Sequence, residues 1–504
     1  MTLTPRRHIA IGLGLLLALP GCGAGLATPA GEARAGEEAA AQVEKGIGLV
    51  DAPELESYLG EIGQRVVASS PEVRTDFEYQ FRIVDMPEPN AFALPGGKIY
   101  ISRGLLALLN SEDELANAVA HEVGHVAARH HLKTALQRAP FMPVRIATGL
   151  AAGVLDLATL PLGALGAPAR AGGAVVALLG AAPGAFYLAG YSRGQEREAD
   201  ALGQKFAAAG GWDPAAMSRV MEALARDERL HGGDPSHRSF FATHPSPPDR
   251  EERTRRQAAE LARGAPPTFA RDRAHFIAAL DGLLVGDSAE GGVVDGTRFL
   301  HADLDFQLAF PDGWKVENGV NNVAAIPADA KPDTAVPFAT LTVAAEGDDP
   351  VATASALLAK SEFEPDGDVA PISIGTLRAA RVTGRDRTTR PAYRLTAHWI
   401  AHHGLVFQVV GAAPEAGFER LRTELEAVAR SFRTLEAANR ARVVEARLRV
   451  VESRRGETLA KLLERKPGAW KLPVAAAANA LPEDAVFDAA RPVKNAIWER
   501  YPRD

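Results

Sequence analysis

One short segment of the sequence combines residue types that can hold a metal ion and move a proton. Residues 121–125 read His-Glu-Val-Gly-His, an H-E-x-x-H pattern. On a helix, His121 and His125 stand one turn apart on the same face, so both imidazoles can reach one zinc ion. Glu122 lies about 100° further round the helix, close enough to reach a water molecule beside the ion without being a ligand. The pattern predicts hydrolysis by a zinc-activated water, with Glu122 as general base and acid.

The residues around this pattern have the features of a helix. Ser111 and Glu114 form an S-x-x-E capping box, and apolar residues follow at helical spacing, which predicts a helix over 111–137. Because Val, Ala and Leu surround the polar pattern, a metal explains the pattern better than chance does. His130 and His131, further along the same helix, are interpreted as surface residues.

A catalytic zinc site needs a third protein ligand and an open fourth position. In the segment 191–206, helical spacing places Glu196 and Asp200 on one face, four residues apart. We interpret Glu196 as the third ligand and Asp200 as the hydrogen-bond partner that fixes the tautomer of a ligand histidine. For this segment taken alone, a solvated charged helix start is the alternative.

With these residues in this order, the sequence resembles the zinc metallopeptidases related to BepA, HtpX and the CAAX prenyl endopeptidases. In that family the first Glu of E-x-x-x-D is the third ligand, which maps to Glu196 in E-R-E-A-D. Two further motifs match: N-A-F-A-L-P-G-G at 90–97, an edge strand in the family, and T-H-P at 243–245 followed by Arg250. The resemblance covers roughly residues 41–260 and implies a zinc peptidase.

The motif that starts at Asn90 predicts a short strand, K-I-Y-I, at 98–101 after a Pro-Gly-Gly turn. An exposed edge strand binds an extended peptide through main-chain hydrogen bonds. Asn90, Gly97 and Ile99 are therefore candidate substrate-binding residues, and a purely structural hairpin is the alternative.

His244 and Arg250 lie in a proline-rich loop, and the resemblance implies that both line the zinc cleft. A cationic or hydrogen-bonding group there would stabilise the oxyanion, so both are candidate catalytic residues. Two alternatives exist for His244. It binds zinc at the fourth position and holds the enzyme inactive, or it is a surface residue. The sequence leaves these roles open.

The start of the chain has the features of an exported lipoprotein. Residues 1–21 combine two arginines with an uncharged stretch of signal-peptide length, and Cys22 follows in a sequence that resembles a bacterial lipobox. We expect a signal peptide at 1–21, a lipid anchor at Cys22 and a flexible tether over 22–40, hence a periplasmic protein anchored to the outer membrane. A signal peptide without lipidation is the alternative. We expect the apolar stretch at 140–190 to cover the cleft or rest on the membrane rather than span it.

Composition sets the remaining bounds. The 504 residues, 46% hydrophobic and 24% charged, suit a globular protein of about three domains. A net charge of −7 without blocks of like charge argues against nucleic acid as a partner. One cysteine excludes a disulfide scaffold and a cysteine-based zinc finger.

The predicted fold class is α+β multidomain. We expect a mainly helical zinc-peptidase domain with a small edge-strand sheet at 41–265, a linker at 266–296, an α+β accessory domain at 297–436 and a C-terminal module at 443–504. Alternating patterns predict accessory strands at 298–310, 337–345, 378–384, 393–401 and 405–411, and helices at about 351–360 and 414–434. The accessory histidines are interpreted as sheet or turn residues: His301, His398, His402 and His403.

The C-terminal module carries R-G-E-T-L at 455–459 after a predicted strand at 446–451. This resembles the start of a lysin motif, with Glu in place of Asp, and implies contact with peptidoglycan. The whole sequence predicts a cell-envelope zinc endopeptidase, and the resemblance implies misfolded or misassembled proteins as substrates. An envelope chaperone or assembly scaffold with little turnover, and a cell-wall hydrolase, are the alternatives. Glu122 argues against the first and the motif order against the second.

Overall fold

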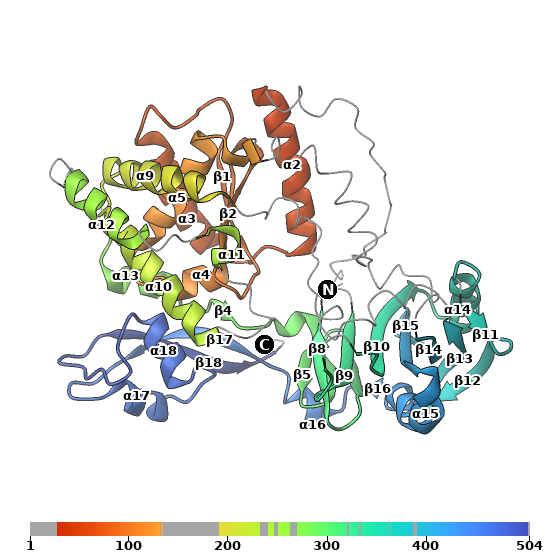
Figure 1. Cartoon of the computed structure of the whole chain (residues 1–504). Coiled ribbons are helices and arrows are strands. Elements are labelled where there is room, and N and C mark those ends of the chain that lie inside the picture. Colours follow the sequence, from red (N-terminus) through yellow and green to blue (C-terminus); the bar gives the residue numbers. More distant parts are fainter. Residues whose placement is uncertain are drawn as a thin grey trace, which may run out of the picture.

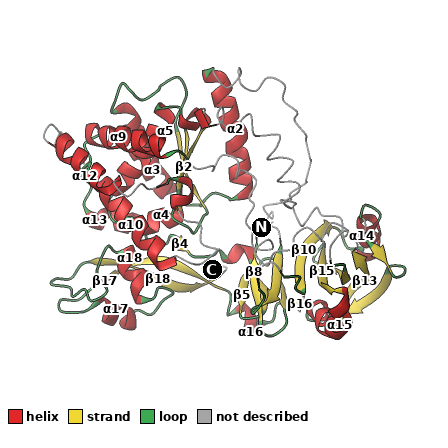
Figure 2. Cartoon of the chain, viewed as in Figure 1, coloured by secondary structure: helices red, strands yellow, loops and turns green. Residues whose placement is uncertain are grey.

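The computed structural model describes residues 28–131, 133–134, 191–231, 240–245, 250–262, 270–319, 322–331, 334–361, 363–386 and 391–501. Figure 1 shows a helical part with the C-terminal strands packed beneath it, and a strand-rich domain beside them. Figure 2, coloured by secondary structure, shows mainly helices in the first part and mainly strands in the second. The fold therefore belongs to the α+β class, as predicted. The expected signal peptide, Cys22 and the whole stretch 140–190 lie outside the described residues. Within the described residues, no helix combines the length and the apolar character that crossing a membrane requires.

The helical part is built around one buried helix, α5 (Glu112–Ala127), which begins at the Ser111 cap predicted from the sequence. Its residues from Leu115 to Val126 are buried on all sides, as expected of a helix in the middle of a core. The helices that surround it or complete this part are α3 (Pro53–Ala68), α4 (Arg103–Leu108), α9 (Arg193–Ala209), α10 (Ala216–His231), α11 (Phe240–Thr243), α12 (Arg250–Leu261) and α13 (Arg273–Ala279).

A three-stranded sheet lies against this bundle, with β1 (Gln80–Val84), β2 (Ala91–Leu94) and β3 (Lys98–Ser102) in the order β1-β3-β2. The K-I-Y-I segment is β3, and it is the central strand, because Ile99 pairs with Phe81 in parallel and with Ala93 in antiparallel register. The expectation that K-I-Y-I is the edge strand is therefore wrong. The edge next to it is β2.

The expected flexible tether over 22–40 differs from the structure, which has a helix, α2 (Pro29–Gly46), capped by Thr28. It packs so closely on the turn η1 (Pro95–Gly97) that a Cβ at Gly36 would lie 2.0 Å from the carbonyl oxygen of Pro95. Glu32 on this helix forms an ion pair of 2.7 Å with Arg74. The helix is thus part of the peptidase domain.

The accessory domain matches four of the five predicted strands and both predicted helices to within a few residues. The strand expected at 298–310 is instead two antiparallel strands joined by a turn. An eight-stranded sheet contains β11 (Glu364–Pro365), β12 (Ala370–Ile374), β13 (Leu377–Asp386), β14 (Tyr393–His402), β15 (Leu405–Pro414), β10 (Phe338–Glu346), β9 (Val323–Pro327) and β8 (Trp314–Asn318). A four-stranded sheet contains β16 (Arg433–Thr434), β7 (Phe306–Ala309), β6 (Arg298–His301) and β5 (Val293–Asp295), and the helices are α14 (Pro350–Leu358) and α15 (Glu415–Arg430). The four accessory histidines lie on strands or in a turn, as expected.

The C-terminal module is built from β17 (Val444–Glu452), α17 (Leu459–Arg465), α18 (Leu472–Ala478) and β18 (Pro492–Arg500). The strands pair in antiparallel register, and β4 (Leu284–Val285) joins β17. Leu448 and Ala496 belong to the same hydrophobic core as Leu115 of α5. The expected linker at 266–296 also differs from the structure, because α13 places Phe276 and Ile277 in that core.

Candidate metal centre

Two glycines let α5 and α9 approach closely enough to form the site. A Cβ at Gly203 would lie 2.8 Å from the backbone nitrogen of His121, and one at Gly124 would lie 3.0 Å from the carbonyl oxygen of Ala199. Any larger side chain at Gly203 would push the helices apart. This contact brings Glu196, in the first turn of α9, to the histidine pair of α5.

Four buried side chains converge at this contact. His121, His125, Glu196 and His244 each offer a ligand atom, and these atoms lie within 4.8 Å of one another. The Nε2 atoms of His121 and His125 are 3.0 Å apart. Glu196 places Oε1 3.4 Å from Nε2 of His125 and Oε2 3.7 Å from Nε2 of His121. Ligand atoms of a tetrahedral zinc site lie about 3.4 Å apart, given bonds of about 2.1 Å, so these residues fit zinc.

The protonation of the histidines supports this fit. Nδ1 of His121 lies 3.1 Å from Oδ1 of Asp200, and this carboxylate favours the tautomer with the proton on Nδ1, which leaves Nε2 free to bind a metal. Burial lowers the pKa of His125 well below its usual value, which favours the neutral ring that a metal ligand needs. The 3.0 Å separation of the two Nε2 atoms suits two rings that both point at one metal ion.

Glu122 lies beside these residues but is not one of the four that offer a ligand atom. Its side chain is fully buried, and among the described residues neither of its oxygens has a hydrogen-bond partner. Burial is the largest influence and raises the pKa of Glu122 despite the nearby histidines. Its nearest ion-pair partner is Nε2 of His244, at 3.9 Å. A buried carboxylate without a hydrogen bond costs free energy, so its place beside the metal ligands points to a chemical role.

Arg250 lies in the site but faces the carboxylates rather than an open position. Its Nε and Nη2 donate to the two oxygens of Asp200 at 2.8 Å each, and Nη2 also lies 3.0 Å from Oε2 of Glu196. Burial alone would raise the pKa of Asp200, but Arg250 and His121 outweigh it and lower that pKa. The geometry thus gives Arg250 a positioning role, which differs from the expected place near the oxyanion.

His244 bridges the third ligand and the edge strand. Its Nδ1 lies 3.1 Å from Oε1 of Glu196, and its Nε2 donates to the carbonyl oxygen of Ala91 on β2 at 3.1 Å. Burial alone would lower the pKa of His244, but the carboxylates of Glu196 and Glu122 outweigh it and raise that pKa. The ring stacks on Phe240, with centroids 4.4 Å apart.

The candidate substrate residues around β2 lie in different places. Asn90 donates its backbone N–H to Ser102 at the start of β2, whereas Gly97 lies in the turn against Phe77. Ile99 is buried on the central strand. The residue of this motif that reaches the site is Ala91.

Two residues that contact His125, namely His130 and Tyr191, were not predicted from the sequence. The expectation that His130 and His131 lie on the surface is wrong, because both are buried or nearly so. The helix ends at Ala127 rather than near 137, since Arg129 takes a positive φ of 54° and turns the chain back.

After this turn, Nδ1 of His130 lies 3.0 Å from Nδ1 of His125, and Nε2 of His130 lies 3.1 Å from Glu198. Tyr191 stacks on the other side of His125, with centroids 3.9 Å apart. Glu198, the second Glu of E-R-E, was the only sign of the first contact that the sequence offered.

The helical fold and this group of residues define a metallopeptidase domain. Residues 53–258 match the model of Peptidase family M48.

Relatives align over the same region. A "Beta-barrel assembly-enhancing protease" of Yersinia pestis is 29% identical over 42% of this chain and 41% of that protein. A "Putative beta-barrel assembly-enhancing protease" of Vibrio cholerae is 32% identical over 42% of this chain and 40% of that protein. A "Mitochondrial metalloendopeptidase OMA1" of Schizosaccharomyces pombe is 32% identical over 38% of this chain and 49% of that protein. The aligned region thus spans less than half the length of each relative.

Proposed function

We propose that this chain is a zinc-dependent endopeptidase of the bacterial cell envelope that hydrolyses misfolded or misassembled proteins. The observation that carries the proposal is the unpartnered Glu122 carboxylate beside His121, His125 and Glu196. The M48 domain and the names of the relatives support the reaction class. The cell-envelope role is supported by the names of the bacterial relatives, which refer to β-barrel assembly.

His121, His125 and Glu196 would hold the zinc ion, which when bound lowers the pKa of water to about 7 and polarises a carbonyl. Glu122 accepts the proton of the attacking water and gives it to the leaving amine. Its raised pKa suits a group that must keep a proton between these two steps. Asp200, fixed by Arg250, accepts from Nδ1 of His121 and so directs Nε2 of that ring to the ion.

The edge strand β2 suits an extended polypeptide chain as substrate, since main-chain hydrogen bonds along an edge strand are independent of sequence. All four residues of β2 are buried in the structure, so the strand must be uncovered before a substrate can pair with it. Nε2 of His244 occupies the carbonyl oxygen of Ala91 on this strand. A substrate that pairs there displaces His244, which favours the role of an inhibitory latch over that of a catalytic residue. Activity that rises in His244→Ala supports the latch, and activity that falls supports a catalytic role.

The test of the proposed function combines metal analysis with turnover. We expect about one zinc per chain in the purified protein, and cleavage of casein that a chelator abolishes and zinc restores. Glu122→Gln should keep the metal and lose cleavage by a factor of about 10² or more. Glu54→Gln, an exposed residue of α3, is the control and should behave as wild type. Unchanged cleavage by Glu122→Gln would refute the mechanism.

A chaperone or scaffold with little turnover is the second candidate, and the same assay distinguishes it. It would suppress aggregation of the unfolded protein equally well as wild type and as Glu122→Gln, without cleavage.

Two finer features are also proposed from the sequence. A lipid anchor at Cys22 predicts that Cys22→Ser releases the protein from the membrane fraction. Contact of the C-terminal module with peptidoglycan predicts that the full chain sediments with purified murein.

A further inference from the structure

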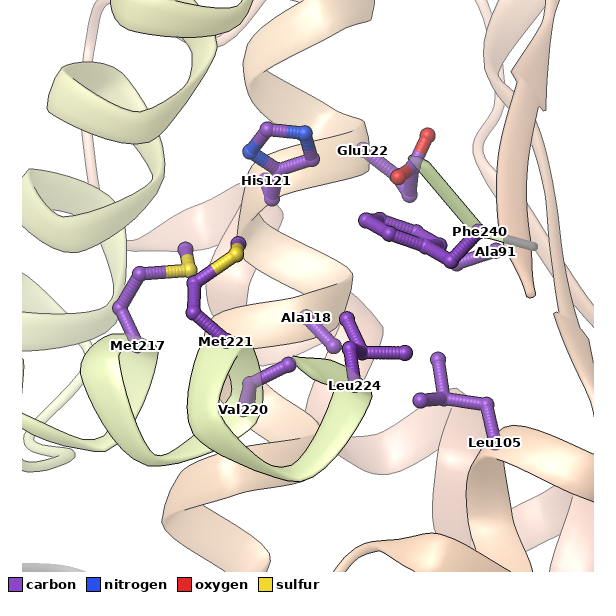
Figure 3. Close-up of a pocket in the computed structure, with 10 residues that line it drawn as sticks. All are labelled: Ala91, Leu105, Ala118, His121, Glu122, Met217, Val220, Met221, Leu224 and Phe240. Carbon is purple, nitrogen blue, oxygen red and sulfur yellow. The ribbon is translucent and has the colours of Figure 1, made fainter. Parts of the chain in front are cut away.

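A small apolar cavity lies directly beside the proposed reaction centre. Figure 3 shows its lining, which comes from β2 and from helices α4, α5, α10 and α11. The lining residues are Ala91, Leu105, Ala118, His121, Glu122, Met217, Val220, Met221, Leu224 and Phe240. The free space inside is about 10 Å³, close to what one water molecule needs.

The position of this cavity relates it to a bound polypeptide. His121 and Glu122 form one end of the lining, and Ala91 belongs to the edge strand. A polypeptide paired with β2 and presenting its carbonyl to the metal ligands advances about 3.3 Å per residue. A side chain that flanks the scissile bond therefore lies next to the cavity.

The chemistry of the lining selects the kind of side chain. Apart from His121 and Glu122, which take part in the reaction, every lining residue is apolar. A charged or amide side chain would lose its hydration there without gaining a partner. An apolar side chain would instead gain contacts with the four residues of α10.

The same residues explain how a nearly filled cavity can admit a side chain. Met217 and Met221 have three rotatable bonds each and adapt to the shape of a neighbour. Phe240, the wall opposite α10 in Figure 3, stacks on His244. Displacement of His244 from β2 removes the support of this wall.

We propose that this cavity is the subsite for an apolar substrate side chain next to the cleaved bond, and that Met221 and Leu224 set the size it accepts. The proposal rests on the proposed endopeptidase function and names its substrate preference. Cleavage sites mapped by mass spectrometry in an unfolded protein give the first test. Leu, Met or Phe should flank the cleaved bond at one fixed position.

The decisive test uses peptides that differ only at that position. Wild type should cleave the Leu or Met peptide at least about 10-fold faster, in kcat/KM, than the Ala or Asp peptide. Met221→Ala enlarges the cavity and should raise the ratio of Phe to Leu cleavage about 10-fold. Leu224→Ala acts on the same wall and replaces Met221→Ala if that variant does not fold. Met86→Ala is the matched control, because Met86 is a buried methionine in a different hydrophobic cluster.

Binding without turnover gives a second readout. Labelled peptides bound to Glu122→Gln protein should show the same order of affinities by fluorescence anisotropy. Cleavage without side-chain preference, or a Phe-to-Leu ratio that folded Met221→Ala and Leu224→Ala both leave unchanged, overturns the subsite while the endopeptidase stands. Zinc-loaded wild type that cleaves nothing overturns both.

Discussion

Nδ1 of His130 lies 3.0 Å from Nδ1 of His125, and Nε2 of His130 lies 3.1 Å from a carboxylate oxygen of Glu198. A carboxylate only accepts hydrogen bonds, so His130 donates from Nε2 and accepts at Nδ1. His125 must then carry its proton on Nδ1, which leaves its Nε2 free to bind a metal. His130 thus fixes the tautomer of His125, as we propose that Asp200 fixes the tautomer of His121.

His130→Ala removes this fixed tautomer and should weaken zinc binding about 10- to 100-fold. The measurement is a competition titration with a zinc chelator of known affinity, which needs no turnover. His131→Ala is the matched control, because His131 pairs with Glu32 away from the ligands. Equal zinc affinity of His130→Ala and wild type would contradict the role.

The contrast between His121 and His130 shows what the sequence could predict. The histidine pair follows from helical spacing, because residues i and i+4 share a face whatever surrounds the helix. The place of Glu196 as the third ligand was implied by the family resemblance. The place of His130 depends on the positive φ of Arg129, which helical spacing does not reveal. The accessory strands could be predicted for the same reason as the helix, because the alternation of apolar and polar residues is also a local pattern in the sequence.

Contacts between distant parts of the chain could not be predicted from such local patterns. The strand β1 makes β3 central, and no local pattern says that a third strand will pair there. The docking of the C-terminal module is also set by tertiary packing, since Leu448 and Leu115 lie far apart in the sequence.

Arg250 holds two buried carboxylates, and its loss should destabilise the folded protein. Arg250→Met removes the guanidinium that Asp200 and Glu196 share and leaves Asp200 with the more distant Arg253 at 3.7 Å, which costs about 3–5 kcal/mol. Urea unfolding of the zinc-free protein measures this loss apart from metal binding. Arg256→Met is the control, because this arginine is exposed on the same helix. A loss no larger than that of the control would show that Arg250 is not needed to hold the two carboxylates.

We expect the stabilisation that Glu32 gives to the packed helix α2 to be lost at acid pH. Burial opposes ionisation, but His131 and Arg74 outweigh it and lower the pKa of Glu32 to about 2. Because the folded pKa lies below the unfolded one, the stabilisation is complete above about pH 4.5 and is lost as the pH falls towards 2. The stability difference between wild type and Glu32→Gln should therefore shrink over this range. Glu38→Gln, exposed on the same helix, should show no such trend, and a constant difference for Glu32→Gln would refute the prediction.

Lys494 connects the C-terminal module to the loop before the active-site helix. Its fully buried Nζ donates to the carbonyl oxygens of Ala107 at 2.7 Å and Leu109 at 2.5 Å, at the end of α4. Lys494→Met fills the same space but leaves both carbonyls without this donor, which costs about 1–3 kcal/mol for each oxygen left unsatisfied. Thermal unfolding should show the loss, and Lys461→Met, exposed on α17, should not.

The same variant tests whether the module supports catalysis. Asn110, which follows these carbonyls, donates to Ala478 of the module and presents its backbone N–H to Glu114 in the first turn of α5. Loosening this junction shifts the helix that carries His121, so kcat should fall at temperatures where Lys494→Met is still folded. A variant with lower thermal stability but wild-type kcat would mean that the module stabilises the domain without positioning its active-site helix.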